Sequence, residues 1–230
     1  DTLDAGGQDD SIYMGAALDP LDVIDGGDQF QVDLVEIGGD YSAGLTLTSS
    51  MLVSIEQLGL DAGTYRLKLA DGITGLALIS MAPGAGGTVD ASAVSAGVQM
   101  EIYGGAPLRV VGAGGNDRFD LRSGDRQVVM VGGGGVDNLD LQTASPFHAA
   151  GHSFSGFETL RLISGWQVVL ADGNVAAGDT LGIAVFDVAA LDGHRETDGH
   201  YDFAGYINAD RVVGGHLADT LAGAAGNDSL

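Results

Sequence analysis

The sequence contains no cysteine, a single lysine and few aromatic residues, and these scarcities exclude several classes of protein. Among 230 residues there are nine basic side chains, and aromatic residues make up 6%. Without cysteine, no disulfide framework can stabilise the chain. The formal charge of -23 at pH 7 makes nucleic acid an unsuitable partner, because its phosphates would be repelled. No apolar run reaches the roughly 18 residues that a transmembrane helix needs.

Glycine and aspartate are abundant instead. Glycine accounts for 39 residues, and only five of the 32 acidic side chains are glutamate. Aspartate tolerates tight turns and left-handed backbone geometry, whereas glutamate favours helices. Acid-rich chains are often disordered, but 45% of these residues are hydrophobic. The composition therefore predicts strands and tight acidic turns around a packed core. The chain starts without a basic and then apolar leader, and we expect it to be a segment of a longer protein.

A nine-residue spacing of aspartates recurs along the chain. Residues 132–140 fit every fixed position of the nonapeptide G-G-x-G-x-D-x-U-x, in which U is a large apolar residue. Other copies are degenerate but keep the aspartate and the apolar residue two positions later. The aspartates of the pattern are Asp1, Asp10, Asp19, Asp28, Asp117, Asp137, Asp210, Asp219 and Asp228. Surface loops have no reason to keep such a spacing, so the pattern indicates a repeat architecture.

The nonapeptides resemble the calcium-binding repeats of the RTX, or haemolysin-type, family of secreted bacterial proteins. The resemblance covers about a third of the chain. It implies an all-β fold, a right-handed parallel β-roll or β-solenoid, in which six residues form a Ca²⁺-binding turn and three form a short strand. It also implies export through a type I secretion channel, and folding once the chain reaches calcium outside the cell.

Calcium chemistry suits these turns. Ca²⁺ takes six to eight oxygen ligands at about 2.3–2.6 Å, and glycines permit the positive φ that directs turn carbonyls inward. One turn cannot complete the shell, so each ion is expected between stacked turns. The predicted metal-binding residues are Asp1, Asp9, Asp10, Gly115, Asp117, Gly133, Gly135, Asp137, Asn208, Asp210, Gly215, Asp219, Gly226, Asn227 and Asp228. The turns before Asp19 and Asp28 lack most of these glycines and are expected to bind calcium weakly or not at all. Asp125 is a candidate for the coil between Asp117 and Asp137.

A longer repeat surrounds the nonapeptides. Glu56 and Glu158 are 102 positions apart in similar sequences, and so are Asp117 and Asp219, which indicates an internal duplication. The predicted organisation is RTX nonapeptides at 1–33, 104–141 and 205–230, with strand-rich inserts at 34–103 and 142–204. We expect the inserts to continue the solenoid as calcium-poor coils, with a separate small sandwich as the alternative. The end of the chain at 228–230 is equivalent to its start at 1–3, which favours one unit of a tandem array.

No catalytic motif is complete. Ser153 lies in a sequence close to G-x-S-x-G, but its last position is Ser155 and no helix pattern follows. His148 and His152 lack the glutamate of H-E-x-x-H. A polar cluster contains His194, Glu196, Asp198 and His200, and side chains of these types can bind Zn²⁺. We expect this segment to be an exposed loop instead. We therefore predict that the segment is not an enzyme.

The favoured function is a calcium-dependent structural or spacer segment of a large secreted RTX surface protein, such as a fibre, an adhesin stalk or a surface-layer component. Its expected partners are calcium ions and neighbouring repeat units of the same chain or other copies, at the bacterial cell surface. One alternative is a calcium-dependent module that binds cell-surface glycans. Its candidate stacking residues are Trp166, Tyr41, Tyr65, Tyr201 and Tyr206. The other is the non-catalytic calcium-binding part of a secreted RTX enzyme or toxin.

Overall fold

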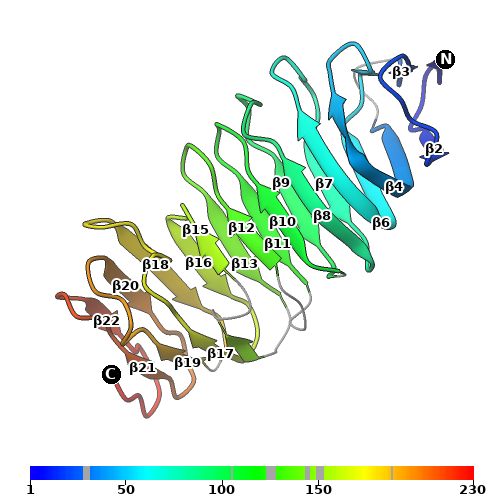
Figure 1. Ribbon diagram of the computed structural model, residues 1–230. Coiled ribbons are helices and arrows are strands. Elements are labelled where there is room, and N and C mark those ends of the chain that lie inside the picture. Colours follow the sequence, from blue (N-terminus) through cyan, green and yellow to red (C-terminus); the bar gives the residue numbers. More distant parts are fainter. Residues whose placement is uncertain (28–31, 105, 123–127, 143–145, 149–152, 188) are drawn as a thin grey trace.

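The chain forms an elongated stack of parallel strands with one terminus at each end (Figure 1). This computed structural model describes residues 1–27, 32–104, 106–122, 128–142, 146–148, 153–187 and 189–230. The described residues form strands, turns and bends, and no helix. They accordingly include no helix that could cross a membrane. The predicted parallel β-solenoid is confirmed.

Two faces of the stack carry most of the strands. The strands of the first face are β2 (Ser11–Gly15), the first part of β4 (Leu34–Leu47), the first part of β6 (Gln57–Leu69), β7 (Leu78–Met81), β9 (Gln99–Ile102), β11 (Arg118–Leu121), β13 (Asn138–Leu141), β16 (Thr159–Leu162), β18 (Thr180–Val185), β20 (His200–Ala204) and β22 (Thr220–Ala222). The second face contains the later parts of β4 and β6, then β8 (Ala85–Asp90), β10 (Leu108–Val111), β12 (Val128–Val131) and β15 (Ser153–Ser155). Both faces belong to one sheet because β6 bends and pairs with β7 and then with β8.

Two smaller sheets complete the stack. The sheet near the N-terminus contains β1 (Thr2–Asp4), β3 (Val23–Asp25) and β5 (Leu52–Val53). The sheet near the C-terminus contains β14 (Pro146–His148), β17 (Trp166–Val169), β19 (Ala189–Asp192) and β21 (Arg211–Val213). Every strand pair is parallel, and paired residues lie between 18 positions apart, as for Asp202 and Thr220, and 28 positions apart, as for Ile24 and Leu52. One coil of the solenoid therefore corresponds to about two nonapeptides.

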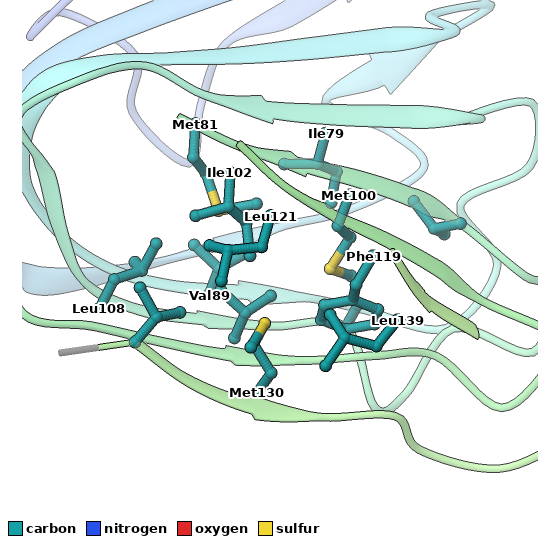
Figure 2. Packing of buried hydrophobic residues seen from close by; sticks show 14 of the residues in the cluster. Ile79, Met81, Val89, Met100, Ile102, Leu108, Phe119, Leu121, Met130 and Leu139 are labelled. Carbon is teal, nitrogen blue, oxygen red and sulfur yellow. The ribbon is translucent and has the colours of Figure 1, made fainter. Parts of the chain in front are cut away.

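The core is a narrow layer between the two faces. Alternate residues of each strand point inward, and Phe119 and Leu121 of β11 are both fully buried. Figure 2 shows side chains of β7, β9 and β11 pointing toward Val89, Leu108 and Met130 of the opposite strands. Each fully buried side chain of this size contributes about 1.5–3 kcal/mol, so stacking of apolar columns is a major source of stability.

The inserts continue the solenoid, as expected. The same sheet runs through all five predicted segments, and their boundaries fall between strands of one stack. The separate sandwich is not seen among the described residues. The 102-residue repeat corresponds to five coils, because five successive pairings lead from Leu58 to Leu160 and the path from Phe119 to Leu221 also takes five.

Candidate metal-binding turns

On the first face, Arg118 and the residues that pair with it in successive coils are each preceded by one residue. These preceding residues form a column along the stack. Its members are Asp10, Asp33, Glu56, Ala77, Val98, Asp117, Asp137, Glu158, Leu181, Tyr201 and Asp219. Seven of these eleven residues are acidic, and we call these seven the carboxylate column. The column lies two positions before buried residues such as Phe119, so its side chains point inward at the edge of the solenoid. Asp117 and Asp137 are accordingly 1% exposed.

The carboxylates of the column bind the backbone of the preceding coil. The N–H of Asp117 donates to Oδ1 of Asp137 at 2.7 Å, and the N–H of Asp137 donates to Oε2 of Glu158 at 2.6 Å. The same contact joins Asp10 to Asp33, Asp33 to Glu56, Val98 to Asp117 and Tyr201 to Asp219. The two glutamates that marked the internal duplication therefore occupy the position of the nonapeptide aspartates.

At two places, neighbouring coils are joined by hydrogen bonds that run in both directions. The N–H of Val32 donates to Oδ1 of Asp9 at 3.0 Å, so Asp9 and Asp10 exchange bonds with the next coil in both directions. Asn116 plays the part of Asp9 in the central coils, where it accepts the N–H of Val136 at 2.9 Å. The predicted residue Asp9 is thus placed beside Asp10 in a clamp between two turns.

A second column lies where the chain leaves the first face. Asp210 and Asp228 are in register on this side, and the N–H of Asp210 donates to Oδ1 of Asp228 at 2.9 Å. At the N-terminal end, Asp1 is in register with Asp22, whose Oδ1 lies 2.7 Å from the nitrogen of Asp1. Consecutive nonapeptides therefore alternate between the two edges, and Asp219 lies on the opposite edge from Asp210.

The nine-residue spacing at the N-terminal end does not describe the coils there. Asp22 is in register with Asp1, and Asp33 is in register with Asp10, because these coils are 21 and 23 residues long. Asp19 instead bonds within its own turn, where its Oδ1 accepts the N–H of Leu21 at 2.7 Å. Asp28 and Asp125 lie outside the described residues.

The first glycine of a nonapeptide leaves room for the aspartate five positions later. A Cβ on Gly132 would lie 2.6 Å from Oδ2 of Asp137, so any side chain at this position would displace the carboxylate. The same close approach occurs at Gly112 toward Asp117, Gly205 toward Asp210, Gly214 toward Asp219 and Gly223 toward Asp228. Our sequence reasoning missed these five glycines as site residues, although each begins a G-G or G-A pair before its aspartate or stands where that pair is expected.

The predicted glycines and asparagines occupy the same turns. Gly133 and Gly135 have φ values of +117° and +106°, and Gly226 has +138°, a region that favours glycine. Gly215 donates its N–H to Oδ2 of Asp219 at 2.7 Å. The remaining predicted residues are Gly115, which packs against Gly97, Asn208, which donates to Asp187, and Asn227, which is exposed.

Several of the turn carboxylates are buried without a cation. Asp33 and Asp210 are at most 2% exposed, and no ion pair found among the described residues involves the carboxylate column or Asp210. Oδ2 of Asp10, of Asp33 and of Asp210 has no hydrogen-bond donor. Burial raises the pKa of Asp210, and it raises the pKa of Asp137 to about 6, helped by nearby negative charges. These oxygens are available to a bound cation.

A different set of buried carboxylates already has its countercharges. Asp120 and Asp140 are at most 1% exposed on the outside of β11 and β13, beneath arginine side chains. Oδ2 of Asp140 lies 2.8 Å from Arg118 and 3.0 Å from Arg161, and Oδ1 of Asp120 lies 3.0 Å from Arg118. Arg122 pairs with Glu101 at 3.0 Å. The charges of this arginine face are balanced by its own side chains, although Oδ1 of Asp140 accepts no hydrogen bond. Our sequence reasoning missed the face because most of its ion pairs join residues about 20 positions apart.

A third group of acids lies in the second insert. Asp172, Glu196 and Asp198 each offer a carboxylate oxygen within 4.8 Å of the others, and this cluster could hold a metal ion. The histidines of the alternative Zn²⁺ set point elsewhere. Nδ1 of His194 lies 2.6 Å from Oδ1 of Asp192, and Nδ1 of His200 lies 2.8 Å from the carbonyl oxygen of Ala218.

The aromatic residues of the glycan-binding alternative are mostly in the core. Tyr41, Tyr65 and Tyr201 are at most 7% exposed, and the first two stack with ring centroids 5.9 Å apart. Tyr206 is exposed, whereas the side chain of Trp166 lies outside the described residues, as do His152 and the side chains of His148 and Ser153. Three of the five predicted stacking faces are therefore covered by the protein itself.

Comparisons with protein-family models, with curated proteins and with solved structures found no match for this chain. The chemistry of the turns consequently rests on the identity, burial and charge of their own residues.

Proposed function

We propose that the chain is a calcium-dependent structural or spacer segment of a secreted bacterial surface protein of the RTX type, such as a fibre, an adhesin stalk or a surface-layer component. One observation carries this proposal: among the described residues, the buried carboxylates of β11 and β13 have arginine partners, whereas those of the Gly-Asp turns have none. Asp120 and Asp140 lie beneath arginines, whereas Asp33, Asp137 and Asp210 form no ion pair with a basic side chain among the described residues.

The free oxygens of the turns fit a hard cation. A carboxylate accepts about four hydrogen bonds, so the backbone N–H bound by Asp137 leaves most of its acceptor capacity unused. Calcium prefers carboxylate and carbonyl oxygens, and the unpartnered Oδ2 atoms of Asp10, Asp33 and Asp210 are of this kind. Aspartates one coil apart, such as Asp210 and Asp228, would share an ion when calcium is bound.

Binding of this kind would couple folding to the extracellular environment. Without a cation, burial of unpaired carboxylates opposes folding, since charged groups are costly to remove from water. A site with a dissociation constant near 10⁻⁴ M at millimolar calcium contributes about 1.4 kcal/mol of stability. With several such sites, the chain would be mostly unfolded at submicromolar calcium and folded at the millimolar calcium outside the cell. This dependence suits export before folding.

The shape of the molecule supports a spacer role. β1 and β22 lie at opposite ends of an elongated stack (Figure 1). Each coil contacts its neighbours through parallel strand pairs, so further coils or further copies could extend the rod. The proposed partners are therefore calcium ions and adjacent repeat units, and the proposal includes no catalytic activity.

Circular dichroism with and without calcium tests the proposal. We expect a chelator to abolish the β-sheet signal of the segment and millimolar Ca²⁺ to restore it cooperatively. Mg²⁺ at the same ionic strength is the control for charge screening, and it should restore little signal because it dehydrates reluctantly and demands octahedral geometry. Identical spectra in chelator and in Ca²⁺ would contradict calcium-dependent folding.

A further inference from the structure

The column of inward residues lacks an acid at Ala77 and Val98 and again at two neighbouring coils of the second insert. Leu181 and Tyr201 stand in register at the position where most other coils carry an acid. The turns of these coils supply acids instead. Asp172 lies in the turn before β18, and Glu196 and Asp198 lie in the turn before β20. The edge therefore keeps its negative charge here by a different arrangement of residues.

Glu196 is the buried member of this group. Its side chain is fully buried, and its Oε1 accepts the N–H groups of Thr197, Asp198 and Gly199 at 3.1–3.3 Å. Its Oε2 is also buried but has no hydrogen-bond donor. An unpartnered carboxylate oxygen inside a protein costs free energy unless a ligand or ion satisfies it.

A second buried oxygen without a partner lies close by. Tyr201 is 1% exposed, and its hydroxyl oxygen makes no hydrogen bond. Its ring lies directly beneath the start of the same turn, since a Cβ on Gly193 would collide with it. Burial raises the pKa of Tyr201, and the negative charges of Glu196, Asp219 and Asp172 raise it further. The hydroxyl therefore stays protonated and neutral.

We propose that Asp172, Glu196 and Asp198 bind one divalent cation of the calcium class. Their carboxylate oxygens lie within 4.8 Å of one another, and two oxygens bound to one Ca²⁺ can be up to about 5.2 Å apart. The group can thus reach a single ion without a change of backbone. All of its donors are oxygens, which calcium prefers and zinc does not. This site lies outside the Gly-Asp turns and does not depend on calcium binding there.

The ion would join two successive coils. Asp172 already accepts bonds from the N–H and the hydroxyl of Thr197, at 3.2 Å and 2.8 Å, so the two turns are in contact. A cation shared by Asp172, Glu196 and Asp198 adds a second link at the point where the column itself offers none. The site would join two coils of the calcium-poor insert, the second of which lies next to the C-terminal nonapeptides.

A count of bound calcium tests this site. The double variant Asp172→Asn/Asp198→Asn removes two ligands while keeping side-chain size, and Asp179→Asn/Asp202→Asn is its control, since it removes the same charge from exposed acids of the same region. Equilibrium dialysis at about 1 mM free Ca²⁺ should show one ion fewer in the first variant than in the wild type or the control. Hydrogen exchange at 170–179 and 193–199 should slow with calcium in the wild type but not in that variant.

A second variant tests the same site in case the first one does not fold. Glu196→Gln keeps the acceptor oxygen that three backbone N–H groups use, and it should also lose one ion. Unchanged stoichiometry in both variants, or preference of these residues for Zn²⁺ over Ca²⁺, would overturn the site. If the wild type binds one ion and Asp172→Asn/Asp198→Asn binds none, this site holds and the calcium-binding Gly-Asp turns fail. If the wild type binds several ions and neither variant loses any, only this site fails.

Discussion

The backbone N–H of Asp117 lies 2.7 Å from Oδ1 of Asp137, one coil further along the chain. Asp137 in turn donates its own N–H to Glu158. Each acid thus acts through its backbone toward the next coil and through its side chain toward the previous one. Because the donors are backbone groups, these hydrogen bonds join the coils even when no ion is bound. The column therefore has a structural role that is separable from metal binding.

Replacement of Asp219 separates these two roles. Its carboxylate accepts the N–H groups of Tyr201 and Gly215 at 2.8 Å and 2.7 Å. At the same millimolar Ca²⁺ concentration, Asp219→Ala should lower the free energy of unfolding by about 1–3 kcal/mol more than Asp219→Asn, because only alanine leaves these N–H groups without an acceptor. Asp219→Asn, which keeps one acceptor oxygen, should cost less. Urea denaturation measures the difference, and equal losses in the two variants would contradict the structural role.

The same variant should act locally on calcium binding. Asp219→Ala is expected to weaken binding in the C-terminal turns and to leave the turns at Asp10 and Asp33 largely unchanged, since these lie at the opposite end of the stack. Hydrogen exchange at rising calcium concentration, read separately for the two ends, provides the measurement. A uniform loss along the chain would contradict independent sites.

Two glycines of one nonapeptide should respond differently to alanine. A Cβ on Gly132 would lie 2.6 Å from Oδ2 of Asp137 and closer still to the carbonyl oxygen of Gly156, so we expect a loss of about 1–3 kcal/mol. A Cβ on Gly134 would lie 3.4 Å from the carbonyl oxygen of Gly114, and Gly134→Ala should change stability by at most about 0.5 kcal/mol. Thermal unfolding of the two variants tests the difference. A larger loss of stability for Gly134→Ala than for Gly132→Ala would contradict this arrangement of the turn.

The arginine face should be insensitive to calcium. Arg118→Ala removes a cation from both Asp120 and Asp140 and should cost about 1–3 kcal/mol near pH 7. Burial raises the pKa of Asp140, and loss of Arg118 would raise it further, so the cost should shrink at acidic pH as the carboxyl becomes neutral. Arg109→Ala, at an exposed position of the second face, is the matched control. A loss that calcium restores would contradict the separation of the two carboxylate sets.

The raised pKa of Asp137 predicts that the stability of the calcium-free protein depends on pH. Its pKa rises from about 3.9 in the unfolded chain to about 6 in the folded one, chiefly because of burial. Its contribution to stability is therefore complete below about pH 4 and is lost as the pH rises through about 6. In chelator, with an osmolyte such as sucrose added to favour the folded calcium-free chain, the melting temperature of the wild type should fall relative to that of Asp137→Asn over this range.

Calcium should reverse that difference near pH 7, because the ionised carboxylate of Asp137 would then bind the cation and the amide would not. Asp202→Asn, an exposed substitution, serves as the control. A difference between the wild type and Asp137→Asn that does not vary with pH would contradict the influence of burial on this group.

Local sequence signals predicted much of this architecture. The nonapeptides around Asp117, Asp137 and Asp219 form turns followed by short strands, because glycine and aspartate set the turn geometry and the apolar residue two positions later enters the core. The inserts continue the stack for the same reason, since alternating apolar residues such as Leu58 and Leu160 fill equivalent core positions. Calcium binding by these turns stays a prediction.

Other parts of the site could not be predicted from the spacing of residues in the sequence. Asp33 joins the carboxylate column although its coil is 23 residues long, which breaks the nine-residue pattern. Glu56 and Glu158 take aspartate positions because the longer glutamate side chain also reaches the preceding N–H. The ion pair of Arg118 with Asp140 depends on a register that no local motif specifies.

The positions of turns and strands follow from local sequence, because backbone geometry at Gly-Asp turns and the alternation of apolar residues are local properties. Which acids face one another depends on tertiary packing. The separation of paired residues varies from 18 to 28 positions, so the partners of each carboxylate depend on how every turn packs on the next. That is why Asp172 and Glu196, from successive coils, meet at one edge, and why only some of the many acids are left without a countercharge.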